Sequence, residues 1–493
     1  MNSTALPSAV HAATPAPTHT SFRDPAGAVI VTGDRVYRVV GAAGCESWDA
    51  FRSSAAFREF ETTGKVVTTH VLEDVAADAP RTLPAVDNAY RALDGQALLE
   101  HGHIGFPNYP YEWAPEMLQA AGLLTLELND RLLDEDRGLK DATPYNVMFR
   151  GSAPVFLDVL SCERRVPGDP IWLSEAQFLR TFVLPLLAHR HLGVGLAQTF
   201  LTHRDGIEPE ELYRVLGWRR CLRPAMFGCV MMPALLSGQA ASRSGLYQRQ
   251  AMNDQAKARF VVQSAYGRAR RALRRAVPER RHSHWTAYMQ GSNNYLPEQF
   301  AGKERFVDAA LASHGPRSVL DIGCNTGHFS VLAARRGASV VAIDYDDAAV
   351  GHVWRRARGE ALDILPLVVD LSRPTPATGW RNAEASSFLE RAAGRFDLVL
   401  MLAVVHHLLV TERVPLDDIV QLASDLSRDL VIMEFVGPED SMFKALARGR
   451  DALFQGLTRA SFEHACQRRF EILGSEHTDG SHRWLYLLRR RAA

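Results

Sequence analysis

The feature that most constrains the fold is an alternation, from about Arg317 onward, of short apolar runs with amphipathic stretches. Several of the apolar runs are almost continuously hydrophobic, which is typical of parallel β-strands that helices cover on both faces. The five strand candidates are Ser318–Ile322, Ser339–Ile343, Ile364–Val369, Phe396–Leu402 and Leu430–Phe435. Because strands that alternate with helices form βαβ units, this part is predicted to be α/β, with a doubly wound, mostly parallel sheet.

The first of these strands leads into a glycine-containing turn. Asp321 stands near its end, and the segment Gly323–Gly327 precedes an amphipathic helix. Glycine permits a sharp turn and a close approach to a ligand, and the helix then points free N–H groups at that ligand. The spacing is Asp-x-Gly-x-x-x-Gly, not the GxGxxG pattern that cradles a diphosphate. A carboxylate at this place suits a cationic ligand.

Two further carboxylates follow later strands. Asp344 comes directly after the second strand, about 20 residues on, where an acidic group can accept hydrogen bonds from ribose hydroxyls. Asp370 ends the third strand. Carboxyl ends of parallel strands meet along one edge of a sheet, so the three acidic side chains are expected around one crevice.

This arrangement resembles the Rossmann-like class I S-adenosylmethionine-dependent methyltransferases over residues 317–490. The resemblance implies that S-adenosylmethionine is the cofactor, with its methionine part at Asp321 and the Gly323–Gly327 turn, its ribose at Asp344 and its adenine beside Asp370. It also matches Phe396–Leu402 to the family's fourth strand. The cofactor-binding residues that we predict on this basis are Asp321, Gly323, Cys324, Asn325, Gly327, Asp344, Asp370 and Leu402. The alternative is a Rossmann-like domain that binds another nucleotide or none.

Three residues are candidates for the chemistry of transfer. His406 and His407 follow the fourth strand, where the family places acceptor-facing residues, and a histidine can remove a hydroxyl proton. Both histidines could instead orient the cofactor. Glu434 is expected to end the fifth strand and to face the same crevice, and Asp440 follows in a loop. Either residue could hydrogen-bond an acceptor hydroxyl, or it could cap the helix that follows. No Asn-Pro-Pro-Tyr-type block is present, which favours an oxygen acceptor over an amide or base nitrogen.

The amino-terminal part, residues 23–225, is expected to be a separate α+β domain. Its block Leu139–Phe149 contains Asp141 and Asn146, and Asp158 follows a short apolar run. This order resembles kinase-like and aminoglycoside-phosphotransferase-like folds, which implies Asp141 as a base and Asn146 and Asp158 as magnesium ligands. However, Leu139 stands where these families often have histidine, and no glycine-rich phosphate loop is evident. An accessory domain that helps to recognise the acceptor is therefore the leading expectation.

The remaining segments complete the predicted organisation. Residues 1–22 are rich in Ala, Pro, Ser and Thr and are predicted to form a disordered tail. Residues 226–284 are rich in arginine and are predicted to be a helical, basic linker. The methyltransferase domain is assigned to residues 285–493.

Composition limits the remaining possibilities. Lys+Arg and Asp+Glu balance at 56 each, so the total charge implies neither nucleic acid nor an anionic membrane as a partner. The six cysteines form no CxxC pair, so no metal site is expected. No secretory signal and no membrane span are recognisable, and a cytoplasmic location is expected. Oligomeric state cannot be predicted.

The sequence thus predicts an enzyme that transfers a methyl group to an acceptor, with a hydroxyl of a small molecule or saccharide favoured. Two alternatives stay open at this point. One is a regulatory protein that binds S-adenosylmethionine without transferring it. The other is a bifunctional phosphotransferase–methyltransferase, which would bind ATP and magnesium in residues 23–225.

Overall fold

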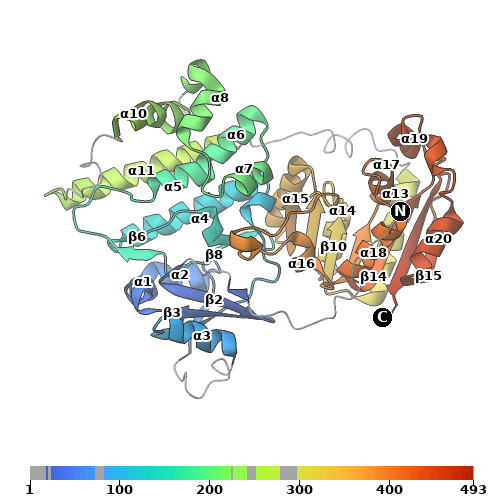
Figure 1. Cartoon of the computed structure of the whole chain (residues 1–493), viewed down its shortest axis with the longest axis horizontal. Helices are drawn as coiled ribbons and strands as arrows, with labels where there is room; N and C mark the ends of the chain where they lie inside the picture. The colour runs from blue at the N-terminus through green and yellow to red at the C-terminus, as the bar shows by residue number, and fades with distance from the viewer. Residues whose placement is uncertain are drawn as a thin grey trace, which may run out of the picture.

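The chain forms two domains that lie side by side, and each contains its own main β-sheet (Figure 1). The structure is a computed structural model of the whole chain. The residues that it describes are 18–19, 24–72, 83–223, 226–240, 251–277 and 297–491. Most of the predicted tail, residues 1–22, lies outside the described residues, but Thr18 and His19 form a short strand, β1.

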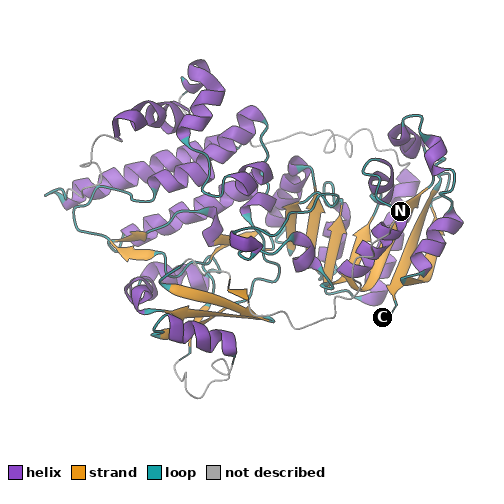
Figure 2. Ribbon diagram, viewed as in Figure 1, coloured by secondary structure: helices purple, strands orange, loops and turns teal. Residues whose placement is uncertain are grey.

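The carboxyl-terminal domain contains a seven-stranded sheet in the order β12-β11-β10-β13-β14-β16-β15 (Figure 2). Its strands are β10 Ser318–Ile322, β11 Ser339–Asp344, β12 Ile364–Val368, β13 Phe396–Met401, β14 Ser427–Val436, β15 Phe470–His477 and β16 Arg483–Arg490. The first five strands pair in parallel, and β16 is antiparallel to both of its neighbours. The predicted doubly wound, mostly parallel sheet is confirmed.

Helices connect these strands and cover the sheet (Figure 2). They are α13 Pro297–His314, α14 His328–Arg335, α15 Asp347–Gly359, α16 Phe388–Ala392, α17 Val405–Val410, α18 Leu416–Leu426, α19 Ser441–Ala447 and α20 Arg459–Gln467. The order of the sheet reverses between β10 and β13, because β11 and β12 lie on one side of β10 and β13 and β14 on the other. Such a switch point opens a crevice at the carboxyl ends of the strands.

The amino-terminal domain begins with a five-stranded antiparallel sheet in the order β1-β2-β3-β5-β4. Its longer strands are β2 Gly27–Thr32, β3 Arg35–Val40, β4 Thr69–Val71 and β5 Ala97–His101. The helices α1 Cys45–Arg52, α2 Ala55–Thr62 and α3 Pro84–Ala92 accompany this sheet.

A helical part follows, built around α4 Pro115–Leu133, most of which is buried. Two antiparallel two-stranded sheets lie beside it: β6 Arg137–Leu139 pairs with β9 Cys162–Arg164, and β7 Val147–Arg150 and β8 Ala153–Phe156 form a hairpin. The further helices are α5 Glu175–Phe178, α6 Leu184–Leu192, α7 Leu196–Thr202, α8 Pro209–Cys221, α10 Met232–Ala240 and α11 Gln255–Ala276. The predicted α+β character of this domain is confirmed.

Helix α11 changes the interpretation of the predicted linker, residues 226–284. The helix packs along α4, buries Val262 and Tyr266, and receives a hydrogen bond from Gln119 Nε2 at the Leu273 carbonyl (3.0 Å). Its arginines face carboxylates of the same domain, as in the ion pair of Arg268 with Glu175. The described part of this stretch therefore belongs to the amino-terminal domain.

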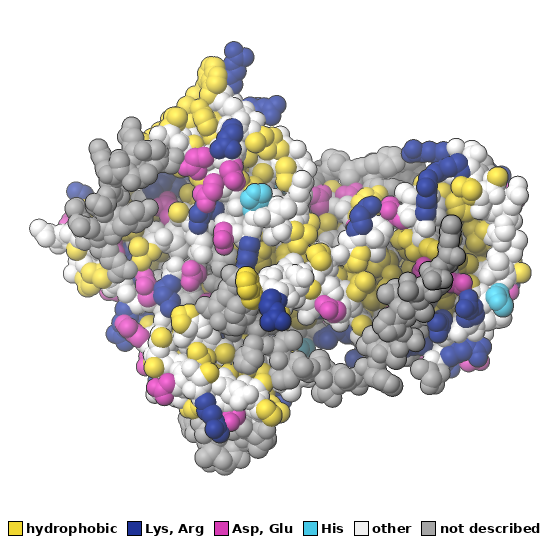
Figure 3. Space-filling view, in the orientation of Figure 1, with side chains coloured by type: hydrophobic (Ala, Val, Ile, Leu, Met, Phe, Trp, Pro, Cys, Tyr) yellow, Lys and Arg dark blue, Asp and Glu magenta, His cyan; other side chains and the backbone are white. Residues whose placement is uncertain are grey.

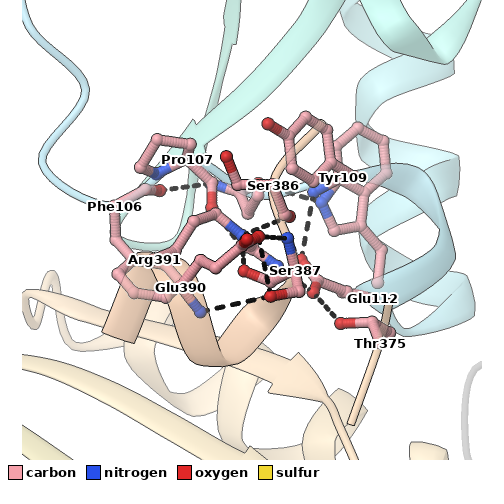
Figure 4. A network of polar contacts seen from close by, with 11 residues as sticks. Phe106, Pro107, Tyr109, Glu112, Thr375, Ser386, Ser387, Glu390 and Arg391 are labelled. Atoms are coloured by element: carbon pink, nitrogen blue, oxygen red, sulfur yellow. Dashed lines mark hydrogen bonds and ion pairs between the residues drawn. The ribbon is translucent and has the colours of Figure 1, made fainter. Parts of the chain in front are cut away.

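The two domains meet in a buried polar network (Figure 4). The carboxylate of Glu112, which is 0% exposed, pairs with Arg391 and accepts a hydrogen bond from Thr375 Oγ1 (2.5 Å). Arg391 also donates to the Pro107 carbonyl (2.5 Å), and its guanidinium lies 5.1 Å from the centre of the Tyr109 ring. A desolvated ion pair thus joins the domains.

A second contact places α4 against α15, the helix that follows Asp344. Arg355 of α15 pairs with Glu116 of α4, and Trp354 Nε1 donates to the Ser152 carbonyl (3.0 Å). A Cβ at Gly351 would lie 2.4 Å from the Glu116 carboxylate, so the helices approach closely because this residue is glycine. The amino-terminal domain therefore braces a helix of the predicted cofactor site.

Candidate active site

The turn after β10 is shaped by two glycines with left-handed backbone conformations, φ +69° at Gly323 and +77° at Gly327. A Cβ at Gly323 would lie 2.5 Å from Val404 Cγ2, and one at Gly327 would lie 2.8 Å from Val353 Cγ2. Any side chain here would therefore add both backbone strain and a steric clash. Helix α14 begins directly after Gly327, so the turn and the start of this helix border one space.

Asp321 lies within β10 at the base of this space. It is buried, and Ser330 Oγ of α14 donates a hydrogen bond to its Oδ2 atom (2.5 Å). Burial raises the pKa of Asp321 to about 6, although the Ser330 hydrogen bond works in the opposite direction. This carboxylate is poorly solvated, so a cationic ligand beside it would favour its ionised form.

Asp344 connects the turn to the second strand. Its two carboxylate oxygens accept hydrogen bonds from the backbone N–H of Asn325 and of Asp346, both at 2.9 Å. Burial raises the pKa of Asp344 to about 6, against the effect of these hydrogen bonds. Its position holds the glycine turn against the carboxyl end of β11.

Asp370 lies two residues beyond the end of β12. Ser372 Oγ donates to its Oδ1 atom (2.6 Å), and Arg373 Nη2 donates to Oδ2 (2.7 Å). Partial burial opposes ionisation, but these hydrogen bonds outweigh it and lower the pKa of Asp370. This third carboxylate is therefore the most readily ionised of the three.

A cavity of about 440 Å³ unites the three carboxylates at the carboxyl ends of the parallel strands. Seven of the eight predicted cofactor residues line it: Asp321, Gly323, Cys324, Asn325, Asp344, Asp370 and Leu402. The eighth, Gly327, shapes the turn but does not line the cavity. A glycine-bounded cavity with buried carboxylates fits a nucleoside that carries a positive charge.

His406 and His407 also line the cavity, in the first turn of α17. His406 is 2% exposed, and its Nδ1 atom has no hydrogen-bond partner among the described residues. Burial, with smaller effects from His407, Arg483 and Lys303, holds the pKa of His406 well below its usual value. Its ring is therefore neutral and can accept a hydrogen bond.

His407 differs from its neighbour in its environment. It is only partly buried, and burial followed by the charge of Arg483 lowers its pKa. The two rings lie 4.4 Å apart, centre to centre. Both predicted histidines thus stand where an acceptor beside the cofactor could reach them.

Glu434, the third predicted catalytic residue, lies behind the cavity wall and does not line it. It is 0% exposed, with Lys303 Nζ 2.6 Å from Oε2 and Arg483 Nη1 3.7 Å from Oε1. Its position indicates that it neutralises these two cations. Asp440 caps α19 by accepting a hydrogen bond from the Met442 N–H (2.8 Å), and it also pairs with Arg483. Of the two roles expected for Asp440, helix capping is therefore the one that the structure shows.

Sequence reasoning missed Lys303 and Arg483, the two buried cations that line the cavity. Lys303 comes from α13, before the predicted strands, and Arg483 begins β16, which was not predicted. No motif marks either residue, because both reach the site only through tertiary packing. The only signal in the sequence was that Arg483 stands at the start of a hydrophobic run.

The kinase-like resemblance implied Asp141 as a base and Asn146 and Asp158 as magnesium ligands, but in the structure their side chains make other contacts or, among the described residues, none. Asp158 forms an ion pair with Arg38 of β3 (2.9 Å), and Asp141 is exposed, with Gln177 Nε2 3.3 Å from its Oδ1 atom. The Nδ2 atom of Asn146 is buried and has no partner among the described residues. Among the described residues of that domain, no group of three or more His, Cys, Asp or Glu side chains is placed to hold a metal ion.

The chain was also compared with known families and searched for helices that could span a membrane. Residues 270–469 match the family model described as a methyltransferase domain. No helix among the residues that the structure describes has both the length and the apolar character needed to cross a bilayer.

Comparison with known proteins extends the match over almost the whole chain. The chain is 30% identical over 477 residues to the nodulation protein NoeA of Rhizobium meliloti, covering 95% of each chain. It is 34% identical over 113 residues to a ubiquinone biosynthesis O-methyltransferase of Caulobacter vibrioides, which is 23% of this chain and 39% of that protein. It is 28% identical over 150 residues to the O-antigen chain terminator bifunctional methyltransferase/kinase WbdD of Escherichia coli, which is 30% of this chain and 19% of that protein.

Proposed function

Because this chain belongs to the family of the nodulation protein NoeA and is an S-adenosylmethionine-dependent methyltransferase, we propose that it methylates a hydroxyl group of a small molecule or saccharide. The observation that carries the proposal is the neutral, buried His406, whose Nδ1 atom faces no protein partner among the described residues while the ring lines the cavity. A neutral hydroxyl is a weak nucleophile, so its methylation benefits from a group that accepts its proton.

S-adenosylmethionine supplies an activated methyl group on a positively charged sulfur. We assign its methionine part to Asp321 and the turn from Gly323, its ribose to Asp344 and its adenine to the surroundings of Asp370. Gly327 is the residue that precedes α14, and the first backbone N–H groups of this helix have no partner within the helix. Their position beside the turn supports this assignment. The poorly solvated carboxylates of Asp321 and Asp344 are stabilised as anions when a cation enters the cavity.

The protein's own contribution is to align the acceptor and to hold its proton. The acceptor hydroxyl would donate a hydrogen bond to the His406 imidazole, which would take its proton. Bound S-adenosylmethionine would supply the methyl group, whose bond to sulfur would break as its bond to oxygen forms, and would leave as the neutral thioether. Burial keeps the His406 imidazole neutral by lowering its pKa, and His407, Arg483 and Lys303 add smaller effects in the same direction. Glu434 and Asp440 hold the Lys303 and Arg483 cations in place. We therefore place Glu434 among the positioning residues of the site.

We assign acceptor recognition to the amino-terminal domain. Tyr345 is 61% exposed and lines the cavity, and Asp347, two residues later, lies 3.3 Å from His189 Nε2 of α6. The domain thus reaches the neighbourhood of the cavity mouth. The name of the Caulobacter relative, an O-methyltransferase, also supports an oxygen acceptor.

A second candidate activity is phosphotransfer by the amino-terminal domain. The order of α4, β6, the Asp141–Asn146 loop, the β7–β8 hairpin and Asp158 follows the kinase-like resemblance and favours this activity. The partial similarity to WbdD, a bifunctional methyltransferase/kinase, also favours it. The ion pair of Asp158 with Arg38 weighs against it, because a guanidinium occupies one side of the carboxylate that magnesium would need. Calorimetric titration of the full chain with ATP and magnesium distinguishes the two, since only a phosphotransferase would bind both.

The acceptor proposal is tested with cofactor that carries a carbon-13 label in its methyl group. The enzyme is incubated with a panel of saccharides and phenols, with matched amines and thiols, and the products are examined by carbon NMR. We expect the label in methyl ethers, and heat-denatured enzyme serves as the control. Label found only on nitrogen, carbon or sulfur would overturn the hydroxyl assignment.

A further inference from the structure

One surface of the amino-terminal domain lies away from the methyltransferase cavity. It is formed by the end of α8, the residues that follow it, the π-helical turn at Phe227–Met231 and α10, which pack against one another. These elements lie at an outer end of the molecule, away from the carboxyl-terminal sheet (Figure 1). We define the α8–α10 surface by its exposed side chains Trp218, Arg219, Arg220, Leu222, Arg223, Phe227, Met232, Leu235 and Leu236.

The apolar side chains of this surface are grouped on helix faces. Trp218 and Leu222 are four residues apart, and Met232 is three and four residues from Leu235 and Leu236, which places each set on one side of its helix. Trp218 is 56% exposed and Leu235 is 53% exposed. Figure 3 shows hydrophobic and basic side chains together at this end of the molecule. Single exposed apolar residues are ordinary, but a contiguous group marks an interaction site.

The charge of this region is one-sided. From Leu212 to Asn253 the sequence contains six arginines and no lysine, aspartate or glutamate, in a chain whose formal net charge is zero. Among the described residues, Arg219, Arg220 and Arg223 form no ion pair, in contrast to Arg259, Arg268 and Arg270 of α11. The same positive field reaches inward: burial, and then Arg190, Arg223 and Arg220, lower the pKa of His191.

We propose that the α8–α10 surface binds the surface of a membrane that contains anionic lipids. Its arginines are suited to phosphate groups of the lipid heads, and its leucines and methionine to the boundary of the acyl chains. Trp218 is exposed beside the arginines, a residue type that favours the interface between membrane and water. A protein partner of matching character would need an acidic and apolar face, whereas an anionic bilayer offers both features at every point.

The surface lies on the bilayer and does not cross it. Helix α10 has nine residues, which correspond to about 14 Å of helix, less than half of the hydrocarbon thickness of about 30 Å. Pro233 and Gly228 interrupt the apolar run that contains it. Attachment of this kind is reversible and depends on salt, because part of it is electrostatic.

The test is sedimentation of the full chain with vesicles of phosphatidylcholine alone, or with part of it replaced by phosphatidylglycerol. We expect binding to the anionic vesicles only, and its loss as sodium chloride is raised. Arg219→Ala with Arg220→Ala should weaken binding roughly 25-fold, at about fivefold for each arginine. Trp218→Ser with Leu235→Ser should also weaken it, without loss of methyl transfer.

Matched controls come from exposed residues of the other domain. Arg305→Ala with Arg469→Ala removes two exposed arginines, and Trp380→Ser with Leu453→Ser removes two exposed apolar side chains. Both control variants should bind anionic vesicles as the unchanged chain does. The proposal fails if the unchanged chain stays in the supernatant, or if control and surface variants bind alike. It also fails if sedimentation equilibrium shows self-association that Trp218→Ser abolishes, because the surface would then join two copies of the chain.

Discussion

At the scale of single residues, two neighbouring histidines occupy different environments. His406 is almost fully buried, with its Nδ1 atom unpartnered among the described residues, whereas His407 is partly exposed. His406→Gln keeps a polar side chain but removes the imidazole base. We expect it to lower kcat by about 10² to 10⁴ with little change in affinity for S-adenosylhomocysteine, measured by steady-state kinetics and calorimetry.

The control for this prediction is His407→Gln, which changes the neighbouring ring and should have the smaller effect on kcat. Full turnover in both variants would show that neither histidine is the base. A loss of cofactor affinity equal to the loss of turnover would assign His406 to cofactor binding instead.

Asp321 and Asp344 give the cofactor site a pH dependence. Burial raises the pKa of each to about 6, so both are ionised above that pH and become protonated as the pH falls through it. A cationic ligand binds better to the ionised carboxylates, and its binding should therefore release protons near pH 6. We expect affinity for S-adenosylmethionine to be constant above about pH 7 and to fall up to tenfold per pH unit for each carboxylate below 6.

Calorimetry in buffers of different ionisation enthalpy measures this proton release directly. Asp344→Asn keeps an oxygen acceptor but cannot ionise, so it should weaken binding at pH 8 and flatten the pH dependence. An affinity that does not change between pH 5 and 8 in the unchanged protein would contradict the assignment of these carboxylates to the cofactor.

At the scale of elements, the turn after β10 has the strictest requirement for glycine. Gly323→Ala combines a left-handed φ of +69° with a Cβ 2.5 Å from Val404 Cγ2. We expect loss of cofactor binding and a destabilisation of more than about 1–2 kcal/mol, because steric contact adds to the cost of the left-handed conformation. Urea denaturation and calorimetry measure the two effects.

Gly337→Ala is the matched control for this turn. Gly337 also has positive φ, +91°, but a Cβ there would meet nothing within 4 Å. It should therefore show the conformational cost alone and leave cofactor affinity unchanged. Equal behaviour of the two variants would mean that Val404 yields and that the turn tolerates a side chain.

The elements also show why some strands could be predicted and others could not. β10 and β13 are paired on both edges and covered by helices, so their sequences are almost entirely apolar and stand out. β15 forms the outer edge of the sheet and alternates with polar residues such as Glu471 and Glu476, which mark no strand by themselves. β16 is paired on both edges, but it contains the buried, ion-paired Arg483 and the partly exposed Arg489 and Arg490, so its sequence is less uniformly apolar.

At the scale of the whole molecule, the ion pair of Glu112 with Arg391 holds two domains together. Arg391→Ala leaves the Glu112 carboxylate buried without its partner, and we expect a destabilisation of about 3–5 kcal/mol. Arg204→Ala is the control, because its pair with Glu384 also joins the domains but the arginine is half exposed. We expect Arg204→Ala to lower the free energy of unfolding by less than about 1 kcal/mol, measured by urea denaturation.

Replacing both partners tests the cause of this effect. Glu112→Leu with Arg391→Met removes both buried charges and should recover most of the stability lost by Arg391→Ala. If Arg391→Ala is no more destabilising than Arg204→Ala, the pair is not a major contribution to the contact between the domains.

The sequence by itself determined the parallel sheet, the strand-end carboxylates and the glycine turn. Each depends on local order: a run such as Val340–Ile343 is apolar because the strand is covered, and Gly323 follows β10 because the chain must turn there. Tertiary structure alone decided that Lys303 and Arg483 converge on the buried Glu434. It also decided that Asp158 pairs with Arg38 and that α11 joins the amino-terminal domain. These contacts join residues far apart in the chain, and their energy depends on burial and partner, which local sequence patterns do not record.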